Sequence, residues 1–374
     1  MEEKKLVPKL RFPGFTEPWE QRKLGEEAIE ILAGGDIEKE KVVYDSGYPI
    51  YANALTNDGL VGYYTDYYRV EAPAVTVTGR GEVGHAQARS QNFTPIVRLL
   101  AIRSKHDCYF LENAINNYKT IVESTGVPQL TVPQLSAYKL CFPLNIEEEK
   151  RISICFQNLD TLITLHQRKL EHLKLKKKSL LQKLFPKEGE VYPELRFPGF
   201  TDPWEQRKLG DMGKTFNGLA GKTKEDFGHG AAQYVTYLNV FQNTMSDLSM
   251  TEKIEIDKSQ NEVQYGDILF TTSSETPEEV GMSSVWLGKM LNTYLNSFCF
   301  GYRPMVDIDH HFIGNLLRSS YVRNKMKILA QGISRYNISK NKVMDLEIAL
   351  PSKEEQKLIG SVLNYTDNLI TLHQ

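Results

Sequence analysis

The strongest constraint on the fold is a sixteen-residue stretch that occurs twice. LRFPGFTEPWEQRKLG occupies residues 10–25, and it returns at residues 195–210 with a single Glu-to-Asp exchange. A shorter pair follows, with LDTLITLHQ at 159–167 and TDNLITLHQ at 366–374. Self-similarity over a domain-sized interval indicates two tandem units of common architecture, whereas a solenoid would repeat every 20 to 50 residues.

The segments between these repeats are dissimilar. Gene duplication alone would explain two units, but later drift should blur the edges and the interiors alike. Nearly identical edges around divergent interiors favour a constant scaffold that carries exchangeable bodies. A chain of 374 residues with 41% hydrophobic and 25% charged residues can build a core for each unit, so disordered and fibrous classes are excluded.

Cysteine usage and hydropathy predict a reduced, cytoplasmic protein. Cys108, Cys141, Cys155 and Cys299 show no metal-ligand spacing, and the N-terminus does not resemble a signal peptide. No stretch approaches eighteen apolar residues, so we expect no membrane span. The formal net charge of -2 gives no global indication of a polyanionic partner.

A long helix is predicted around the first tail repeat. Residues 150–184 lack Gly and Pro, and their apolar residues follow a heptad seam from Ile152 to Leu184. The acidic run Glu147–Glu149 suits a helix start, and Pro186 marks the end. A helix of about 38 residues would be about 57 Å long.

The second tail repeats the seam after Pro351, and each seam needs a partner. The other copy is the obvious one, so we expect the two helices to pack antiparallel, with the bodies at opposite ends of the rod and an approximate twofold axis. His166 and His373 occupy the same seam position. A register-fixing polar pair is the favoured interpretation, and a metal or pH site is the alternative.

The bodies show short β-prone runs broken by Gly, Pro and Asn, which predicts a mixed α+β fold. The polar loops TGRGEVGH at 78–85 and TTSSETPEEVG at 271–281 could read base edges, although ordinary hairpin turns look similar. Enzyme motifs are incomplete. GLAGKT at 218–223 lacks the first glycine of a phosphate-binding loop, and DIDHH at 307–311 is better interpreted as a helix start than as a metal site.

Two divergent bodies, each introduced by LRFPGFT, Glu or Asp, then PWEQRKLG, and each closed by a helix containing LITLHQ, resemble the specificity subunits of Type I restriction-modification enzymes. The resemblance implies two target recognition domains, each followed by a long helix. The implied boundaries are 1–145 for the first domain, 146–186 for its helix, 187–351 for the second domain and 352–374 for a shorter second helix.

The resemblance also implies function and partners. Each domain would read one half of a split site in double-stranded DNA, and the helices would set the spacing and dock two modification subunits. The chain itself would be non-catalytic and bind no cofactor. S-adenosylmethionine, ATP and Mg²⁺ would belong to the modification and restriction subunits.

Transferred to this chain, the resemblance places candidate DNA contacts on loops and on the segments before each tail helix, 123–131 and 330–339. The candidates are Tyr51, Asn53, Thr78, Arg80, Gln129, Tyr237, Asn239, Thr272, Ser273, Ser274, Arg303, Arg335 and Tyr336.

One departure from a DNA-binding protein is the charge distribution. Residues 151–187 carry nine Lys or Arg against two Asp or Glu, so the bodies are not strongly basic, and tight binding is expected to need the partner subunits. The alternatives are a coiled-coil scaffold whose bodies bind proteins and, less favoured, a nuclease acting alone.

Overall fold

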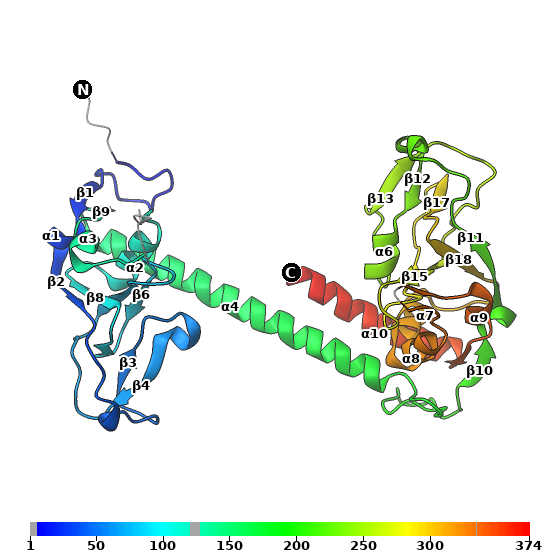
Figure 1. Cartoon of the computed structure of the whole chain (residues 1–374), viewed down its shortest axis with the longest axis horizontal. Helices are drawn as coiled ribbons and strands as arrows, with labels where there is room; N and C mark the ends of the chain where they lie inside the picture. Colours follow the sequence, from blue (N-terminus) through cyan, green and yellow to red (C-terminus); the bar gives the residue numbers. More distant parts are fainter. Residues whose placement is uncertain (1–5, 120–127, 334) are drawn as a thin grey trace. The chain divides into compact units, whose positions relative to one another are not determined.

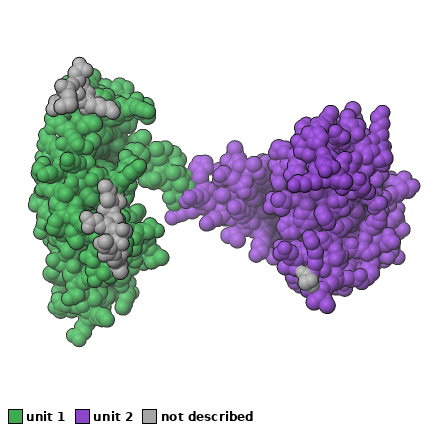
Figure 2. All heavy atoms as spheres, turned by 45° about the horizontal axis from the view of Figure 1, so that its top comes forward, with its two compact units in different colours: residues 1–164 green, residues 165–374 purple. Residues whose placement is uncertain are grey.

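The computed structural model describes residues 6–119, 128–333 and 335–374. The chain divides into two compact units, Met1–Thr164 and Leu165–Gln374 (Figure 2). Each unit combines strands and helices, which confirms the predicted mixed α+β class. Within the described residues, no helix is both long enough and apolar enough to cross a membrane.

Among its described residues, the first unit has nine strands. It also contains the start of the long helix α4 (Figure 1). Its elements are β1 (Glu20–Lys23), α1 (Leu24–Glu27), β2 (Ala28–Ala33), η1 (Lys39–Lys41), β3 (Tyr48–Tyr51), η2 (Thr56–Gly59), β4 (Leu60–Tyr64), β5 (Ala74–Thr78), β6 (Ala86–Arg89), β7 (Thr94–Pro95), β8 (Leu99–Ser104), α2 (Cys108–Asn116), α3 (Val132–Ser136), β9 (Lys139–Phe142) and α4 (Ile146–Lys183).

A four-stranded sheet with the order β2-β8-β5-β6 carries the core of this unit. Strand β5 reads AVTVT and is buried along its whole length, as β-branched residues in a central strand favour. Helix α2 packs on this sheet and begins at Asp107, whose carboxylate accepts the amides of Tyr109 and Phe110. A three-stranded sheet, β4-β3-β7, and the pair β1-β9 complete the unit.

The second unit repeats this topology, with β11-β18-β14-β16, β13-β12-β17 and β10-β20 in the same places, plus the short pair β15-β19. Its elements are β10 (Glu205–Lys208), α5 (Leu209–Met212), β11 (Gly213–Asn217), η3 (Lys224–Asp226), β12 (Phe227–Val235), α6 (Tyr237–Gln242), β13 (Thr251–Ile254), β14 (Ile268–Thr271), β15 (Ser273–Ser274), β16 (Ser283–Val285), β17 (Thr293–Leu295), β18 (Cys299–Pro304), α7 (His310–Arg318), α8 (Ser320–Ile328), β19 (Tyr336–Asn337), α9 (Lys340–Met344), β20 (Glu347–Leu350) and α10 (Lys353–Leu372).

Both long helices are present. Helix α4 has 38 residues, as its lack of Gly and Pro predicted, and α10 has 20. Within the second unit, the C-terminal part of α4 runs antiparallel to α10. Lys177 Nζ lies 2.5 Å from Asp367 Oδ1, and the Nδ1 atoms of His166 and His373 are 2.9 Å apart. A hydrogen bond between two histidines at equivalent positions is consistent with the predicted register-fixing pair.

The repeated head stretch ties each body to its helix through a buried ion pair. Arg11 donates Nε and Nη2 hydrogen bonds of 2.6 and 2.8 Å to Glu148 on α4. Arg196 makes the equivalent pair with Glu355 on α10, with two bonds of 2.8 Å. Each glutamate side chain is only 1% exposed, and this bidentate geometry fixes both position and orientation. The constant sequence therefore builds a constant joint.

Candidate nucleic-acid interface

The loop that follows the buried central strand has the same backbone frame in both units. After β5, the amide of Gly79 donates to Arg98 O, and Gly79 O accepts from the amide of Leu130. After β14, Thr272 makes the same two bonds, to Phe298 O and from the amide of Ile338. All four N···O distances are 2.9 Å. Each loop tip is thus placed beside the segment that precedes α3 or α9.

A side chain two residues after a strand of the smaller sheet completes each frame. In the first unit, Asn53 Nδ2 donates to Arg80 O at 2.8 Å, and its Oδ1 accepts the Gly79 amide at 2.6 Å. In the second unit, the Tyr237 hydroxyl donates to Ser273 O at 2.6 Å. Asn53 and Tyr237 follow equivalent strands, β3 and β12, so the structure aligns these two residues with each other.

In the first unit, the frame brings four predicted residues together: Asn53, Thr78, Arg80 and Gln129. Thr78 is buried, and its hydroxyl accepts the His85 amide at 3.0 Å and donates to Glu82 O, which closes the turn. Arg80 is half-buried, and its Nε has no hydrogen-bond partner among the described residues. Gln129 is exposed. We call Asn53, Arg80, Arg98 and Gln129 the first loop cluster.

Tyr51 is the last residue of β3, two positions before Asn53. The Arg89 guanidinium carbon is 3.7 Å from the centre of the Tyr51 ring, and the ring also contacts Phe93 edge-on at 5.5 Å. Tyr51 therefore supports the smaller sheet in this structure. Of the predicted segment 123–131, residues 123–127 lie outside the described residues.

In the second unit, Tyr237, Ser273, Ser274 and Tyr336 meet, because β15 pairs with β19 so that Ser274 faces Tyr336. Thr272 adjoins them and donates its hydroxyl to Phe298 O at 2.7 Å. Arg335 precedes Tyr336 and is exposed. The second loop cluster comprises Tyr237, Thr272, Ser273, Ser274, Arg335 and Tyr336.

Two predicted residues lie apart from this cluster. Asn239 is fully buried, and its amide donates to Asp247 O at 2.7 Å and to Met250 O at 3.0 Å. Arg303 lies at the other end of β18 and binds the buried carboxylate of Asp267 at 2.7 and 2.8 Å. That hydrogen bond raises the pKa of Arg303. In this structure both side chains hold the body together, and their contact with DNA stays a prediction.

Sequence reasoning missed Arg98 of the first loop cluster. Its Nη1 donates to Gln129 Oε1 at 2.7 Å, and its backbone has a φ of 79°, which is rare for a residue with a side chain. The only local signal was a basic residue before β8, and no motif distinguishes it from other surface arginines. The pairing with Gln129, 31 residues away, exists only in the fold.

The clusters offer a chemistry suited to nucleic acid. Arg and Gln side chains can make bidentate hydrogen bonds to base edges, whereas Ser, Thr and Tyr more often position phosphates. The first cluster contains Arg80, Arg98 and Gln129. The second contains hydroxyl groups and Arg335, and its Ser273 and Ser274 are buried. The same backbone frame therefore carries two chemically different sets of candidate side chains.

Motifs that suggested a metal or phosphate have structural partners. Asp309 caps α7 through the Phe312 amide at 2.9 Å, and Asp307 pairs with Lys353 at 2.6 Å, so DIDHH is a helix start. Lys222 of GLAGKT lies 2.8 Å from Asp257. No group of three or more His, Cys, Asp or Glu within the described residues could hold a metal ion.

Comparison with known proteins agrees with the duplicated architecture. The family described as Type I restriction modification DNA specificity domain matches twice, at residues 16–175 and 201–374. A putative type I specificity subunit of Mycoplasma pneumoniae is 31% identical over 180 residues, covering 46% of this chain and 52% of that protein. The MjaVIII specificity subunit of Methanocaldococcus jannaschii is 26% identical over 267 residues, covering 68% of this chain and 61% of that protein. The chain thus spans about half the length of the first of these relatives and under two thirds of the second.

A crystal structure of the S subunit of a Type I restriction-modification system from M. genitalium shares the fold. It superposes with a TM-score of 0.59 at 13% identity, covering 99% of this chain and 94% of that chain. A chain from a structure of a type I R-M system gives a TM-score of 0.51 at 15% identity, covering 98% and 93%. Because the family matches two segments that together cover most of its length, the chain belongs to the Type I restriction modification DNA specificity domain family.

Proposed function

We propose that this chain is the non-catalytic specificity subunit of a Type I restriction-modification complex. Each unit reads one half of a split site in double-stranded DNA. The two long helices set the spacing between the halves and dock two modification subunits. Restriction subunits join the same cytoplasmic assembly.

The observation that supports this proposal most strongly is the pair of equivalent loop clusters. Both are held by the same backbone bonds after the central strand, at Gly79 in one unit and Thr272 in the other. Their tips differ in side-chain chemistry, as two readers of different half-sites require. The repeated head stretch cannot distinguish half-sites, because its copies differ at one residue, and it forms the joint to the helix instead.

Because the chain is not strongly basic, its partner subunits would contribute part of the free energy of DNA binding. A net charge of -2 provides little of the phosphate neutralisation that dominates affinity for DNA. The modification subunits would supply that positive charge together with S-adenosylmethionine for adenine methylation. The restriction subunits would use ATP and Mg²⁺. This chain binds no cofactor and supplies base readout.

The test uses point variants of the first loop cluster in the assembled complex. The chain is co-expressed with its modification subunit, and methylated adenines are mapped across the host genome. Arg80→Ala combined with Gln129→Ala is expected to relax one half of the methylated motif and leave the other half intact. Loss of one good bidentate contact corresponds to about 1–3 kcal/mol of discrimination.

Arg103→Ala is the matched control, because Arg103 lies at the other end of β8 and pairs with Glu71 at 2.5 Å. It should leave the motif unchanged. A motif that is unchanged in the cluster variant, with normal complex assembly, would refute readout by these residues. Sequence-independent binding of the assembled complex would favour the scaffold alternative.

A further inference from the structure

The loop after β5 holds the main chain of Arg80 in a fixed position. Asn53 makes three hydrogen bonds to it: Nδ2 donates to Arg80 O at 2.8 Å, and Oδ1 accepts the amides of Gly79 and Arg80 at 2.6 and 3.1 Å. A Cβ atom at Gly79 would lie 2.3 Å from Arg98 O, so the close approach of these two segments requires glycine. The side chain of Arg80 therefore starts from a defined point at the loop tip.

The guanidinium group of Arg80 has no partner within the described part of the chain. Its Nε atom is buried without a hydrogen bond, whereas its two Nη groups are neither buried nor bonded to any described residue. Arg89 on β6 shows the contrast, because its guanidinium binds Thr76 Oγ1, Gln87 Oε1 and Asp58 O at 2.8 to 3.0 Å. Arg89 is used to hold the body together, and the Nη groups of Arg80 are open to an external acceptor.

The acceptor atoms of the other side chains in the first loop cluster are already engaged. Asn53 Oδ1 accepts two hydrogen bonds, which uses both of its lone pairs. Gln129 Oε1 accepts from Arg98 Nη1 at 2.7 Å, so its Nε2 amide group remains. Guanidinium groups can only donate. The side chains of this cluster therefore offer N–H donors, and each of their acceptor atoms has a partner inside the protein.

A surface of donors distinguishes between bases in the major groove. Guanine presents two acceptors there, O6 and N7. Adenine and cytosine each present an amino donor, and thymine presents one acceptor beside a methyl group. An arginine fork matches the two guanine acceptors with two parallel hydrogen bonds. Guanine is therefore the base that best fits the first loop cluster.

Phosphate oxygens are also acceptors, but two features of the loop favour a base. Phosphate contacts need only a basic side chain near the DNA backbone, whereas reading one base pair needs a side chain held in register, as Arg80 is. In addition, Glu82 lies exposed two residues further along the loop. A carboxylate repels phosphate, yet it can accept from the amino group of cytosine, the partner of guanine.

We propose that Arg80 recognises a guanine in the half-site of the first unit, and that Asn53 acts through Arg80 as its positioning residue. This proposal rests on the proposed function and adds to it a base and a division of roles. The second loop cluster has no such restriction, because its hydroxyl oxygens can also accept and Ser274 bonds to the carboxylate of Glu279 at 3.3 Å. The guanine is therefore assigned to the first half-site alone.

The first experiment uses the unaltered chain, purified with its modification subunit, and duplexes that carry the methylated motif. The half-site of the first unit is the half that changes when residues 26–145 are exchanged. Each of its guanines is replaced in turn by 7-deazaguanine, which pairs normally but lacks the N7 acceptor. At one guanine, we expect the rate of adenine methylation at subsaturating DNA to fall about tenfold, the value for a hydrogen bond to a charged group.

Chain variants then separate the reader from the residue that positions it. Arg80→Ala should lower the preference for G·C over A·T at that position about 5- to 150-fold, and 7-deazaguanine should then have no further effect. Asn53→Ala should relax the same position. The double variant should be no more relaxed than Arg80→Ala alone, because the two residues act as one unit.

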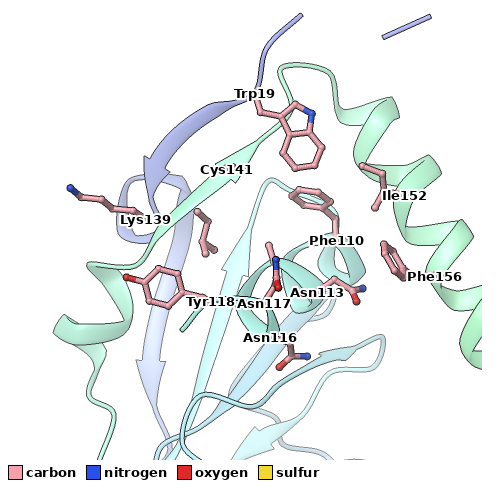
Figure 3. Close-up of a pocket in the computed structure, with 12 residues that line it drawn as sticks. Trp19, Phe110, Asn113, Asn116, Asn117, Tyr118, Lys139, Cys141, Ile152 and Phe156 are labelled. Carbon is pink, nitrogen blue, oxygen red and sulfur yellow. The ribbon is translucent and has the colours of Figure 1, made fainter. Parts of the chain in front are cut away.

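Asn113→Ala is the matched control for Asn53. The Asn113 amide also bonds a backbone oxygen, that of Tyr109 at 2.8 Å, but it lies on α2 and lines a cavity beside α4 (Figure 3). This variant should leave the preference at every position unchanged. Assembly with the modification subunit and an unchanged second half-site verify that each variant folds.

Three results would overturn the proposal and leave the split site standing. The first is a half-site in which every guanine tolerates 7-deazaguanine. The second is an Arg80→Ala complex that methylates all duplexes equally slowly and has a smaller salt slope, as loss of a phosphate contact predicts. The third is relaxation of different base pairs by Asn53→Ala and Arg80→Ala, since Asn53 would then read a base itself. A complex without any split motif would instead refute the proposed function.

Discussion

The first and second units connect the head stretch to the long helix by the same contacts, but only in the second unit is the space beside these contacts filled. Each has a buried Arg–Glu pair between head stretch and helix and an edge-on Trp–Phe contact beneath it. In the second unit Phe185 fills the space beside that contact, and Trp204 is 2% exposed. In the first unit the corresponding space is a groove of about 650 Å³, with Trp19 and Phe110 on the body side and Phe156 on α4 (Figure 3). The comparison shows that the Arg–Glu joint forms without an aromatic side chain in the position of Phe185.

A second difference lies next to α2 and α7. In the first unit, His106 is 10% exposed and lies between Glu149 and Glu27, at 2.7 and 3.0 Å. In the second unit, the same positions hold Ile308, Gln356 and Met212. The equivalence is marked by a shared bond, because the Asp107 amide donates to Glu149 and the Asp309 amide donates to Gln356. One unit therefore has an ionic network where the other has a neutral one.

Removing the Phe185 side chain should have the largest effect on stability. Phe185→Ala is expected to lower the free energy of unfolding of the second unit by about 4 kcal/mol, because a fully buried aromatic side chain leaves a cavity. Phe156→Ala in the open groove should cost under about 1 kcal/mol. Hydrogen exchange of β14 and of β5 reports each unit separately in the full chain. Equal losses would contradict the difference between filled and open grooves.

Breaking the ionic network should be the next largest effect. His106→Ile leaves Glu149, whose side chain is 1% exposed, without its main partner, so the first unit should lose about 3 kcal/mol at pH 6. The triple variant Glu27→Met, His106→Ile and Glu149→Gln reproduces the neutral arrangement of the second unit and should recover most of that loss. Failure of the triple variant to recover protection of β8 would argue against this equivalence.

The same network predicts a pH dependence confined to the first unit. Burial opposes protonation of His106, but hydrogen bonds to Glu149 and Glu27 outweigh it and raise the pKa of His106. Burial also opposes ionisation of Glu27, yet hydrogen bonds from Lys105, Arg22 and His106 lower the pKa of Glu27 to about 2. The raised pKa of His106 therefore affects stability on the alkaline side of neutral pH, and the lowered pKa of Glu27 affects it at acidic pH.

The signs follow from linkage. The His106 contribution is fully present below the ordinary imidazole pKa of about 6.5, and it is lost as pH rises through the raised value. The Glu27 contribution is present above the ordinary pKa of about 4.3 and is lost as pH falls toward 2. Hydrogen exchange, corrected for intrinsic rates, should show protection of β8 declining above pH 7 while β18 does not follow it. Parallel profiles for the two strands would contradict the assignment.

The smallest expected effect concerns the histidine pair on the helices. His166→Ala should change the free energy of unfolding by under about 0.5 kcal/mol, because His166 is exposed and its partner can bond to water. Thermal unfolding of the full chain measures this. A loss of several kcal/mol would mean that the pair stabilises the antiparallel contact as well as fixing its register.

Features set by local chemistry were predictable from sequence. The 38-residue length of α4 followed from an uninterrupted seam between Glu147 and Pro186, and the helix start at Asp309 followed from its capping residue type. The position of the candidate loops after β5 and β14 followed from turn residues that flank β-prone runs. Each of these depends on neighbours within a few residues.

Features that depend on long-range packing were not predictable. YANAL and YLNVF look alike at residues 51–55 and 237–241, yet the structure aligns Asn53 with Tyr237, two positions away from the visual match. Asn239 was a candidate DNA contact because of its residue type, and the sequence does not reveal that its side chain is buried. The groove of the first unit is likewise lined by Trp19, Phe110 and Phe156, which only the fold brings together.

The most direct test of the central claim, that each unit reads its own half-site, is an exchange of one body. Residues 26–145 are replaced by the corresponding body of another family member, and methylated adenines are mapped in cells that also express the modification subunit. One half of the motif should change to the donor's, while the other half and the spacing stay as they were. A motif that does not change, or one in which both halves change, would contradict the account.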